Sequence, residues 1–299
     1  MNQGTFLNGA CINNYTNQSL HILKFDTDGN FISGNHVDFT SPSLGNGNRI
    51  ECTISKTSGN IFINRYHWII FSASPLFAGG NEITHTMFVA AFDPQGNFLW
   101  KQENMQTTFG DRNHITLDPQ DNVYFTGKAI SQNNQNNILP DSFAGFQFSV
   151  ENPEDLVPQT FFVVKMNAQG QGIWAINGSY DQYEGRAMVI NNDELAITKS
   201  FSRVKIGPTN HQTADGNFTP EIIRLNKNTG AVIEISTTQN PQNSITKAEA
   251  IEVDPYGNYY LGGAFGATLQ VGSNQLNYSG GKSDFFYSKI WNIELFAIV

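Results

Sequence analysis

The feature that most constrains the fold is a repeat of short apolar runs, each about as long as one β-strand. Five such runs align along the chain, at 20–26, 87–93, 161–167, 221–226 and 285–290. When Phe25, Phe92, Met166, Leu225 and Ile290 are taken as equivalent, the spacings are 67, 74, 59 and 65 residues. A loose period of this size, with loops of variable length, is typical of repeat architectures such as β-propellers.

Four of the five runs are followed by a turn signal, at 26–30, 93–97, 167–171 and 226–230. In each turn a leading Asp or Asn can accept hydrogen bonds from the turn backbone, and a Gly can adopt positive φ. A second apolar segment follows each turn, and Trp100 and Trp174 lie at the same offset within it. Each pair of segments therefore predicts two antiparallel strands, the third and the outermost of a four-stranded unit.

A second turn recurs upstream in the units, at 56–60, 118–122 and 254–258, with a shortened version at 191–193. Apolar runs flank each of these turns, which predicts the two inner strands of the same unit. The segments 204–207 and 269–272 also occupy equivalent places, because Ile206 and Val271 each lie 19 residues before Leu225 and Ile290. Four strands joined by short turns make up one blade of a β-propeller.

The sequence therefore predicts an all-β fold, a single β-propeller domain over 1–299 with about five four-stranded blades. The predicted blades are 1–48, 49–110, 111–178, 179–243 and 244–299. We expect the first blade to lack its innermost strand, because the chain begins in a predicted second strand at 5–10. Two interpretations of the apolar run 293–299 stay open. It pairs with the first unit and closes a five-bladed ring, or the chain is a fragment of a six- to eight-bladed ring.

Composition agrees with this fold and bounds the partners. Only 14% of the residues are charged, and the polar residues are mainly those that favour strands and turns. The net charge of −9 argues against nucleic acid as a partner. No apolar stretch approaches the ~20 residues of a membrane span, so we expect no membrane insertion. We also expect the chain to be a monomer. Cys11 and Cys52 are expected either as a disulfide or, the favoured alternative, as small buried apolar residues.

One unit resembles a known repeat family. The segment 254–265, Asp-Pro-Tyr-Gly-Asn-Tyr-Tyr-Leu-Gly-Gly-Ala-Phe, and the later Gly280-Gly281-Lys282-Ser283-Asp284-Phe285-Phe286 are similar to the SBBP-type β-propeller repeats of secreted or surface proteins, notably of Bacteroidetes-type bacteria. The best match covers 247–290, and the other units match more loosely. The resemblance implies a propeller and an extracellular or cell-surface location, although residues 1–10 lack the pattern of a signal peptide. It implies no particular activity.

Two patterns are open to a functional or a structural interpretation. The turn 26–30 alternates carboxylates as calcium loops do, but it lacks the later acidic ligand of an EF-hand, so a structural turn is favoured. Apart from this calcium alternative we expect no cofactor, and the six histidines show no metal-binding spacing. Lys24, Lys165, Arg224 and Lys289 share one strand position. They would form either an anion-binding ring or, the favoured alternative, ion pairs between blades.

Two segments are candidates for ligand contact. The first is Tyr66, His67 and Trp68 with the loop that follows, and the second is the long insertion 131–159 with Phe143, Phe146 and Phe148. Long loops of a propeller carry contacts, and aromatic residues beside Asn and Gln suit carbohydrate or protein ligands. The phenylalanines equally suit packing of the loop onto its own blade.

The functional prediction is a non-enzymatic binding or scaffolding module of an exported bacterial protein, with a protein or a surface glycan as ligand. Two alternatives remain. One is a glycan hydrolase or lyase with carboxylates at the channel of the propeller, and the other is a structural spacer without a ligand.

Overall fold

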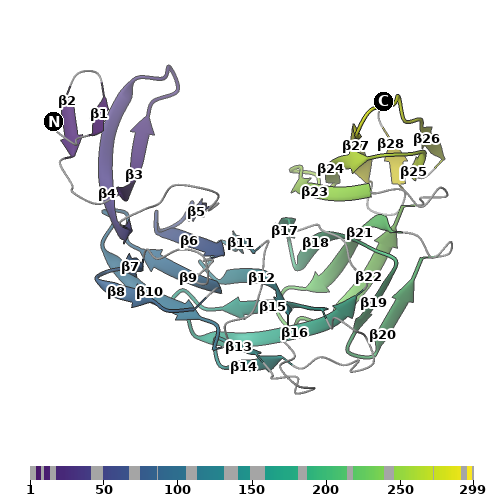
Figure 1. Cartoon of the computed structure of the whole chain (residues 1–299), viewed down its shortest axis with the longest axis horizontal. Coiled ribbons are helices and arrows are strands. Elements are labelled where there is room, and N and C mark those ends of the chain that lie inside the picture. The colour runs from purple at the N-terminus through teal and green to yellow at the C-terminus, as the bar shows by residue number, and fades with distance from the viewer. Residues whose placement is uncertain are drawn as a thin grey trace.

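The computed structural model of the chain is all-β, and the residues that it describes contain no helix (Figure 1). The described residues are 5–7, 10–13, 18–41, 50–66, 75–85, 87–105, 113–130, 141–148, 159–180, 187–213, 218–238, 246–271, 273–290 and 295–297. The strands are short and antiparallel, as expected for apolar runs separated by Asp/Asn-Gly turns.

Most strands belong to five sheets that follow one another along the chain, here called sheets 1 to 5. Sheet 1 contains β3 (Gln18–Phe25), β4 (Phe31–Ser41), β7 (Leu76–Ala78) and β8 (Asn81–Ile83). Sheet 2 contains β5 (Ile50–Ile54), β6 (Ile61–Tyr66), β9 (Met87–Phe92) and β10 (Phe98–Glu103). Sheet 3 contains β11 (His114–Leu117), β12 (Val123–Ile130), β15 (Gln159–Met166) and β16 (Gly172–Tyr180). Sheet 4 contains β17 (Ala187–Asn191), β18 (Glu194–Phe201), β21 (Thr219–Asn226) and β22 (Val232–Thr237). Sheet 5 contains β23 (Thr246–Val253), β24 (Tyr259–Phe265), β27 (Asp284–Ile290) and β28 (Leu295–Ala297).

The predicted strand pairs are confirmed. The inner hairpins β5–β6, β11–β12, β17–β18 and β23–β24 form, and so do the outer hairpins β3–β4, β9–β10, β15–β16 and β21–β22. In sheets 2 to 5 the second strand also pairs with the third, so each unit is one four-stranded sheet with its strands in chain order.

The strand pairing predicted near both chain ends needs correction. A single strand at 5–10 was expected, but β1 (Thr5–Leu7) and β2 (Ala10–Asn13) form a small hairpin of their own, and β3 is the edge strand of sheet 1. The run 293–299 was expected to pair with the first unit and close a ring, or to belong to a fragment of a larger ring. The described part of this run, β28, pairs with β27 and takes the fourth place in sheet 5, as β10, β16 and β22 do in theirs, so the expected pairing with the first unit is not formed by β28.

Units 2 to 5 each also insert a short hairpin between their second and third strands. These hairpins are β7–β8, β13 (Asp141–Phe143) with β14 (Phe146–Phe148), β19 (Arg203–Ile206) with β20 (Thr209–Gln212), and β25 (Leu269–Val271) with β26 (Asn274–Leu276). The predicted equivalence of 204–207 and 269–272 therefore reflects a shared hairpin. β7 pairs with β4 and β19 pairs with β16, so an insertion from one unit extends the sheet of the unit before it.

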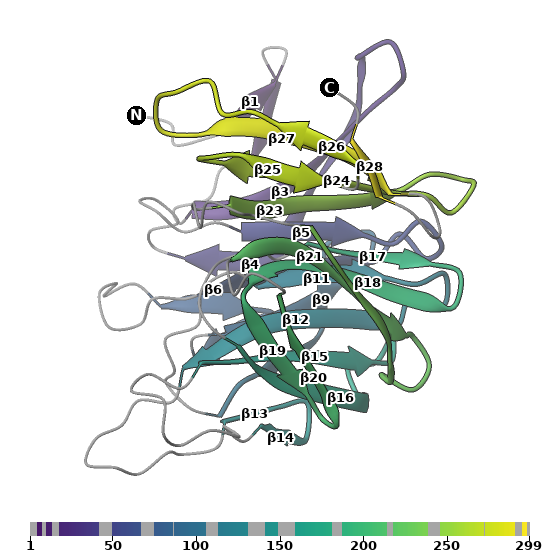
Figure 2. The same ribbon diagram turned by 90° about the vertical axis from the view of Figure 1, so that its right-hand side faces the viewer.

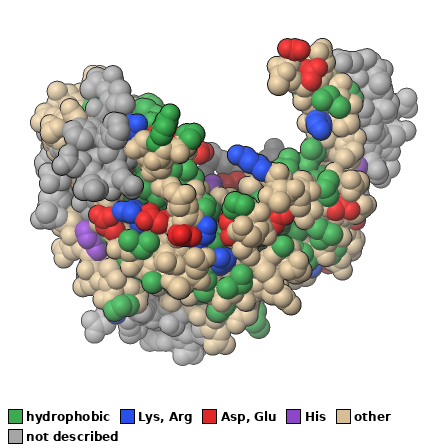
Figure 3. Space-filling model, turned by 180° about the vertical axis from the view of Figure 1, so that it is seen from behind, with side chains coloured by type: hydrophobic (Ala, Val, Ile, Leu, Met, Phe, Trp, Pro, Cys, Tyr) green, Lys and Arg blue, Asp and Glu red, His purple; other side chains and the backbone are tan. Residues whose placement is uncertain are grey.

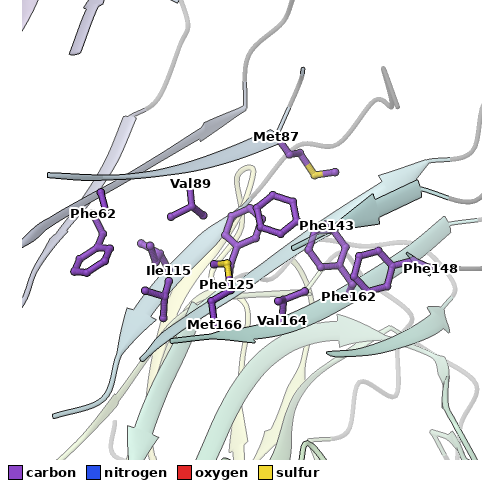
Figure 4. Packing of buried hydrophobic residues seen from close by; sticks show 12 residues of the cluster. Phe62, Met87, Val89, Ile115, Phe125, Phe143, Phe148, Phe162, Val164 and Met166 are labelled. Atoms are coloured by element: carbon purple, nitrogen blue, oxygen red, sulfur yellow. The ribbon is translucent and has the colours of Figure 1, made fainter. Parts of the chain in front are cut away.

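The sheets stand face to face in an open arc (Figure 1). Four apolar clusters fill the four spaces between successive sheets, and Figure 4 shows the one between sheets 2 and 3. The first strands β5, β11, β17 and β23 contact one another in succession. Sheets 1 and 5 end on the same side of the molecule, opposite β13 and β14 (Figure 2). No strand pairing joins these two end sheets within the described residues.

Candidate interaction surface

Successive sheets are joined by a repeated hydrogen bond. In three junctions, a side chain on the fourth strand of one unit donates to the carbonyl of the second residue in the outer turn of the next sheet. The bonds are Asn35 Nδ2 to Pro94 O (3.0 Å), Trp100 Nε1 to Ala168 O (2.8 Å) and Trp174 Nε1 to Lys227 O (3.1 Å). The two tryptophans share an offset in the sequence because each makes this hydrogen bond to the next sheet. The sequence pattern predicted their place on a strand but not this contact.

The glycine of each covered turn is also part of the joint. Gly96, Gly170 and Gly230 have φ between +75° and +89°, which favours glycine. A Cβ on Gly96 would lie 2.0 Å from His36 O, and one on Gly170 would lie 2.7 Å from the Trp100 ring. Gly29 occupies the same place in the outer turn of sheet 1, and no described atom lies within 4 Å of its Cβ position. Within the described part of the chain, the outer turn of sheet 1 is therefore uncovered.

We call the side of a sheet that faces the next sheet its leading face, and the opposite side its trailing face. The joint between sheets 3 and 4 shows what a leading face does. Phe161 and Val163 are fully buried against sheet 4. The Lys165 Nζ donates to Lys227 O over 3.2 Å, and the Tyr124 hydroxyl, which donates to Asp118 Oδ2 over 3.1 Å, lies 3.3 Å from the same carbonyl. An apolar patch with a lysine and a tyrosine at its rim thus binds the next outer turn.

The leading face of sheet 5 repeats this pattern but is exposed. The registers place Tyr260, Phe285, Tyr287 and Lys289 at the positions of Tyr124, Phe161, Val163 and Lys165. Phe285 is 74% exposed and Tyr287 is 44% exposed. At the position of Tyr287, sheets 2, 3 and 4 carry buried Val89, Val163 and Ile222. Sheet 5 therefore presents an aromatic patch where the other sheets make an interface.

The polar rim of this face is ordered. The rings of Tyr260 and Tyr287 stack at 5.6 Å, and Lys289 Nζ lies 3.6 Å from Asp254 Oδ2. Desolvation opposes ionisation of Asp254, but hydrogen bonds from Asn258 and from the Tyr260 hydroxyl outweigh it and lower its pKa to about 2. The carboxylate is therefore charged over the physiological range and holds the lysine and the tyrosine in place.

The trailing face of sheet 1 is the second uncovered face. Leu23 is 37% exposed and Phe25 is 47% exposed, whereas their equivalents in sheet 2, Ala90 and Phe92, are fully buried. His21 lies opposite His36 in the register, with its ring 5.4 Å from that of His36. Within the described residues, none of the other four sheets covers this face as the preceding sheet does in units 2 to 5.

Figure 3 shows the two end sheets as the arms of a U with a notch between them. Hydrophobic side chains lie beside the notch on the arm of sheet 5, and acidic side chains lie at the tip of the arm of sheet 1. The outer turn of sheet 1 carries exposed Asp26 and Asp28. The two uncovered faces together form our candidate interaction surface.

The residues predicted for ligand contact lie elsewhere. Phe143 and Phe148 are buried in the cluster between sheets 2 and 3, where they stack on Phe125 (4.8 Å) and Phe162 (4.6 Å) (Figure 4). Phe146 packs against the same cluster and is partly buried. The packing alternative therefore accounts for these phenylalanines. His67 and Trp68 lie outside the described residues, as does the side chain of Tyr66 at the end of β6.

The shared cation position forms ion pairs, as the favoured alternative predicted, but within one sheet rather than between blades. Lys165 Nζ lies 3.9 Å from Asp118 Oδ2, and Arg224 Nη2 lies 2.6 Å from Glu194 Oε1. Each acid and base belong to the same sheet, because the inner turn reaches across to the third strand. Lys24 in sheet 1 is exposed.

The turn 26–30, a candidate calcium loop, has the hydrogen bonds of a structural turn. Asp26 Oδ1 accepts from the backbone N–H groups of Asp28 and Asn30, and its Oδ2 accepts from the Asn30 side chain. Asp93, Asp118 and Asp254 make the same bonds in their own turns. Among the described residues, no group of three or more His, Cys, Asp or Glu side chains is placed to hold a metal ion. Cys52 is a free and exposed thiol, so the expectation that it is buried is wrong.

A second polar cluster lies at the joint between sheets 3 and 4. Glu221 is buried, and its Oε1 lies 3.5 Å from His211 Nε2 and 3.3 Å from Thr219 Oγ1. Lys199 lies opposite Glu221 on the neighbouring strand, with its Nζ 5.1 Å from the centre of the Phe161 ring. Burial raises the pKa of Glu221 to about 9. The carboxyl group is therefore neutral near pH 7.

Comparisons with known proteins add no assignment, since no family model and no curated protein matches this chain. No helix in the described part of the chain has the length and apolarity needed to cross a membrane.

Proposed function

We propose that this chain is a β-propeller-type repeat domain that acts as a non-enzymatic binding or scaffolding module of an exported or cell-surface bacterial protein. The propeller assignment is supported by the five sheets in chain order, by their face-to-face packing, and by the succession of first strands along the inside of the arc. The SBBP-type resemblance of 247–290 supports the location.

The exposed leading face of sheet 5 is the observation that carries the binding role. Phe285 and Tyr287 present apolar area to solvent, while Tyr260 and Lys289 offer a hydroxyl and an ammonium group at its edge. Rigid aromatic anchors with a polar rim are the usual composition of a binding hot spot. A protein or a glycan is the class of ligand that such a face accepts.

The test compares binding of the folded chain to an immobilised panel of oligosaccharides and peptides with that of two variants. The double variant Phe285→Ser, Tyr287→Ser removes the aromatic anchors and is expected to lose at least about tenfold in affinity, because hot-spot truncations cost about 2 kcal/mol or more. Ile173→Ser is the matched control, since Ile173 is 47% exposed on an outermost strand away from the face. Binding that survives in the double variant, or glycan cleavage by the chain, would contradict the proposal.

A further inference from the structure

The two uncovered faces are complementary halves of one more inter-sheet joint. A joint consists of a leading face, which supplies an apolar patch with lysine and tyrosine donors, and an outer turn with its trailing face, which supplies the carbonyl and the glycine. Sheet 5 has the first half and sheet 1 has the second. The same polypeptide thus carries both halves, and Figures 1 and 3 show that they stand apart in one molecule.

We propose that the partner of this surface is a second copy of the chain, which docks the trailing face of its sheet 1 on the leading face of sheet 5. This inference rests on the proposed function and names its partner. It departs from the expectation of a monomer. The contact matches, at its lysine, tyrosine and apolar positions, an interface that the chain already forms between sheets 3 and 4.

The joint between sheets 3 and 4 predicts the contacts of the new one. Lys165 Nζ and the Tyr124 hydroxyl reach Lys227 O, the carbonyl of the second residue in the outer turn. In the new joint, Lys289 and Tyr260 of one copy would reach the carbonyl of Thr27 in the other. Phe285 and Tyr287 would cover Leu23 and Phe25, which are exposed in one molecule.

Charge also favours this occupant. The outer turn of sheet 1 carries Asp26 and Asp28 next to Thr27, and both acids are exposed. The equivalent turn of sheet 2 has a glutamine, Gln95, in place of Asp28. A lysine at the rim of the docking face therefore meets an acidic turn, which favours the encounter of the two copies.

The contact is heterologous, since it joins different surfaces of the two copies. A heterologous contact closes into a ring when its rotation permits, and otherwise continues as a filament. Two U-shaped copies offer two leading and two trailing faces, so a reciprocal pair satisfies all four. We therefore expect a dimer with two equal joints.

The experiment measures the molar mass of the whole chain by light scattering and sedimentation velocity over a wide range of protein concentration. We expect the wild-type chain to be a dimer and the end variants Phe285→Asp and Phe25→Asp each to be monomeric. Both replaced side chains are exposed, so the variants should keep the far-UV circular dichroism of the wild type. Ile173→Asp is the matched control and should remain dimeric.

Mixing the two end variants gives the decisive result. The Phe285→Asp chain keeps an intact sheet 1, and the Phe25→Asp chain keeps an intact sheet 5, so an equimolar mixture restores one joint. We expect dimers in the mixture, with a dissociation constant about a hundredfold or more above that of the wild type, because one joint replaces two.

Three outcomes would overturn the inference. They are a wild-type chain that stays monomeric at every concentration, a Phe25→Asp chain that still dimerises alone, and a mixture that stays monomeric. A monomeric wild type that binds a panel oligosaccharide or peptide through Phe285 and Tyr287 would refute the second copy as partner and leave the binding function standing. Absence of both self-association and panel binding would refute the two together.

Discussion

Glu221 takes a position that three other sheets fill with phenylalanine. The registers make it equivalent to Phe88, Phe162 and Phe286, which are buried. In sheets 3 and 5 a glycine on the second strand leaves room for the ring, since a Cβ on Gly263 would lie 2.7 Å from Phe286. Sheet 4 replaces this glycine–phenylalanine pair with Lys199 and Glu221. A repeat position that changes from apolar to ionisable makes the joint between sheets 3 and 4 sensitive to pH.

The sign of this effect follows from the raised pKa. A carboxyl group that holds its proton more tightly in the folded state stabilises the fold below its unfolded pKa near 4.5, and that stabilisation is lost as pH rises toward 9. Burial lowers the pKa of the facing His211, so this histidine is neutral in both states above pH 7. Between pH 7 and 9, we therefore expect the free energy of unfolding to fall with a slope of about 1.4 kcal/mol per pH unit at pH 7, which decreases to about half that value at pH 9.

Urea denaturation of the wild type and Glu221→Gln at several pH values between 7 and 9 checks this expectation. The amide cannot ionise, so the variant should lose the fall with pH and be the more stable chain at pH 9. Glu252→Gln, at an exposed position on β23, should keep the wild-type slope. A wild-type stability that does not change between pH 7 and 9 would show that Glu221 keeps no raised pKa.

At the scale of elements, the outer turns are where one sheet meets the next. Gly170 and Gly29 hold the same turn position with similar positive φ, +79° and +85°, but only Gly170 is covered by a tryptophan. Alanine at either site should cost about 1 kcal/mol for its backbone conformation. At Gly170 the new methyl group must also displace Trp100, which adds about 1–3 kcal/mol.

Chemical denaturation in a Phe285→Asp background measures this difference without a contribution from a second copy. Gly170→Ala should be the less stable variant by at least about 1 kcal/mol in the free energy of unfolding. Equal losses for Gly170→Ala and Gly29→Ala would mean that the Trp100 contact adds nothing to the joint.

Much of the element structure was predictable from the sequence, because the turn chemistry is local. The Asp/Asn-Gly turns set the outer hairpins, because a tight turn fixes which residues of the two strands lie opposite each other. The inserted hairpins were missed in part, since β7 and β13 are only three residues long and β7 pairs with β4 of the preceding unit. Exposure of Phe285 was not predictable, because its equivalents are buried and only the arrangement of whole sheets decides which face stays uncovered.

At the scale of the molecule, the described sheets form a linear series in which the apolar clusters join each sheet to its neighbours. The stability of such arrays is approximately a sum of the stabilities of the units and of the joints between them. Sheets 2, 3 and 4 have a joint on both faces, whereas sheets 1 and 5 have one each. Local opening should therefore be easiest at the two ends of the arc.

Hydrogen exchange resolves this gradient and links it to assembly. In the monomeric Phe285→Asp variant, we expect the backbone amides of β12 and β15, in the central sheet 3, to exchange slowly. We expect the amides of β3 and β27, in the end sheets 1 and 5, to exchange faster. A second copy adds a joint to each end sheet, so β3 and β27 should become protected together in the wild type at concentrations where it is dimeric. Protection of β27 without β3 would mean that sheet 5 is covered by something other than sheet 1, because a head-to-tail contact must bury both ends at once.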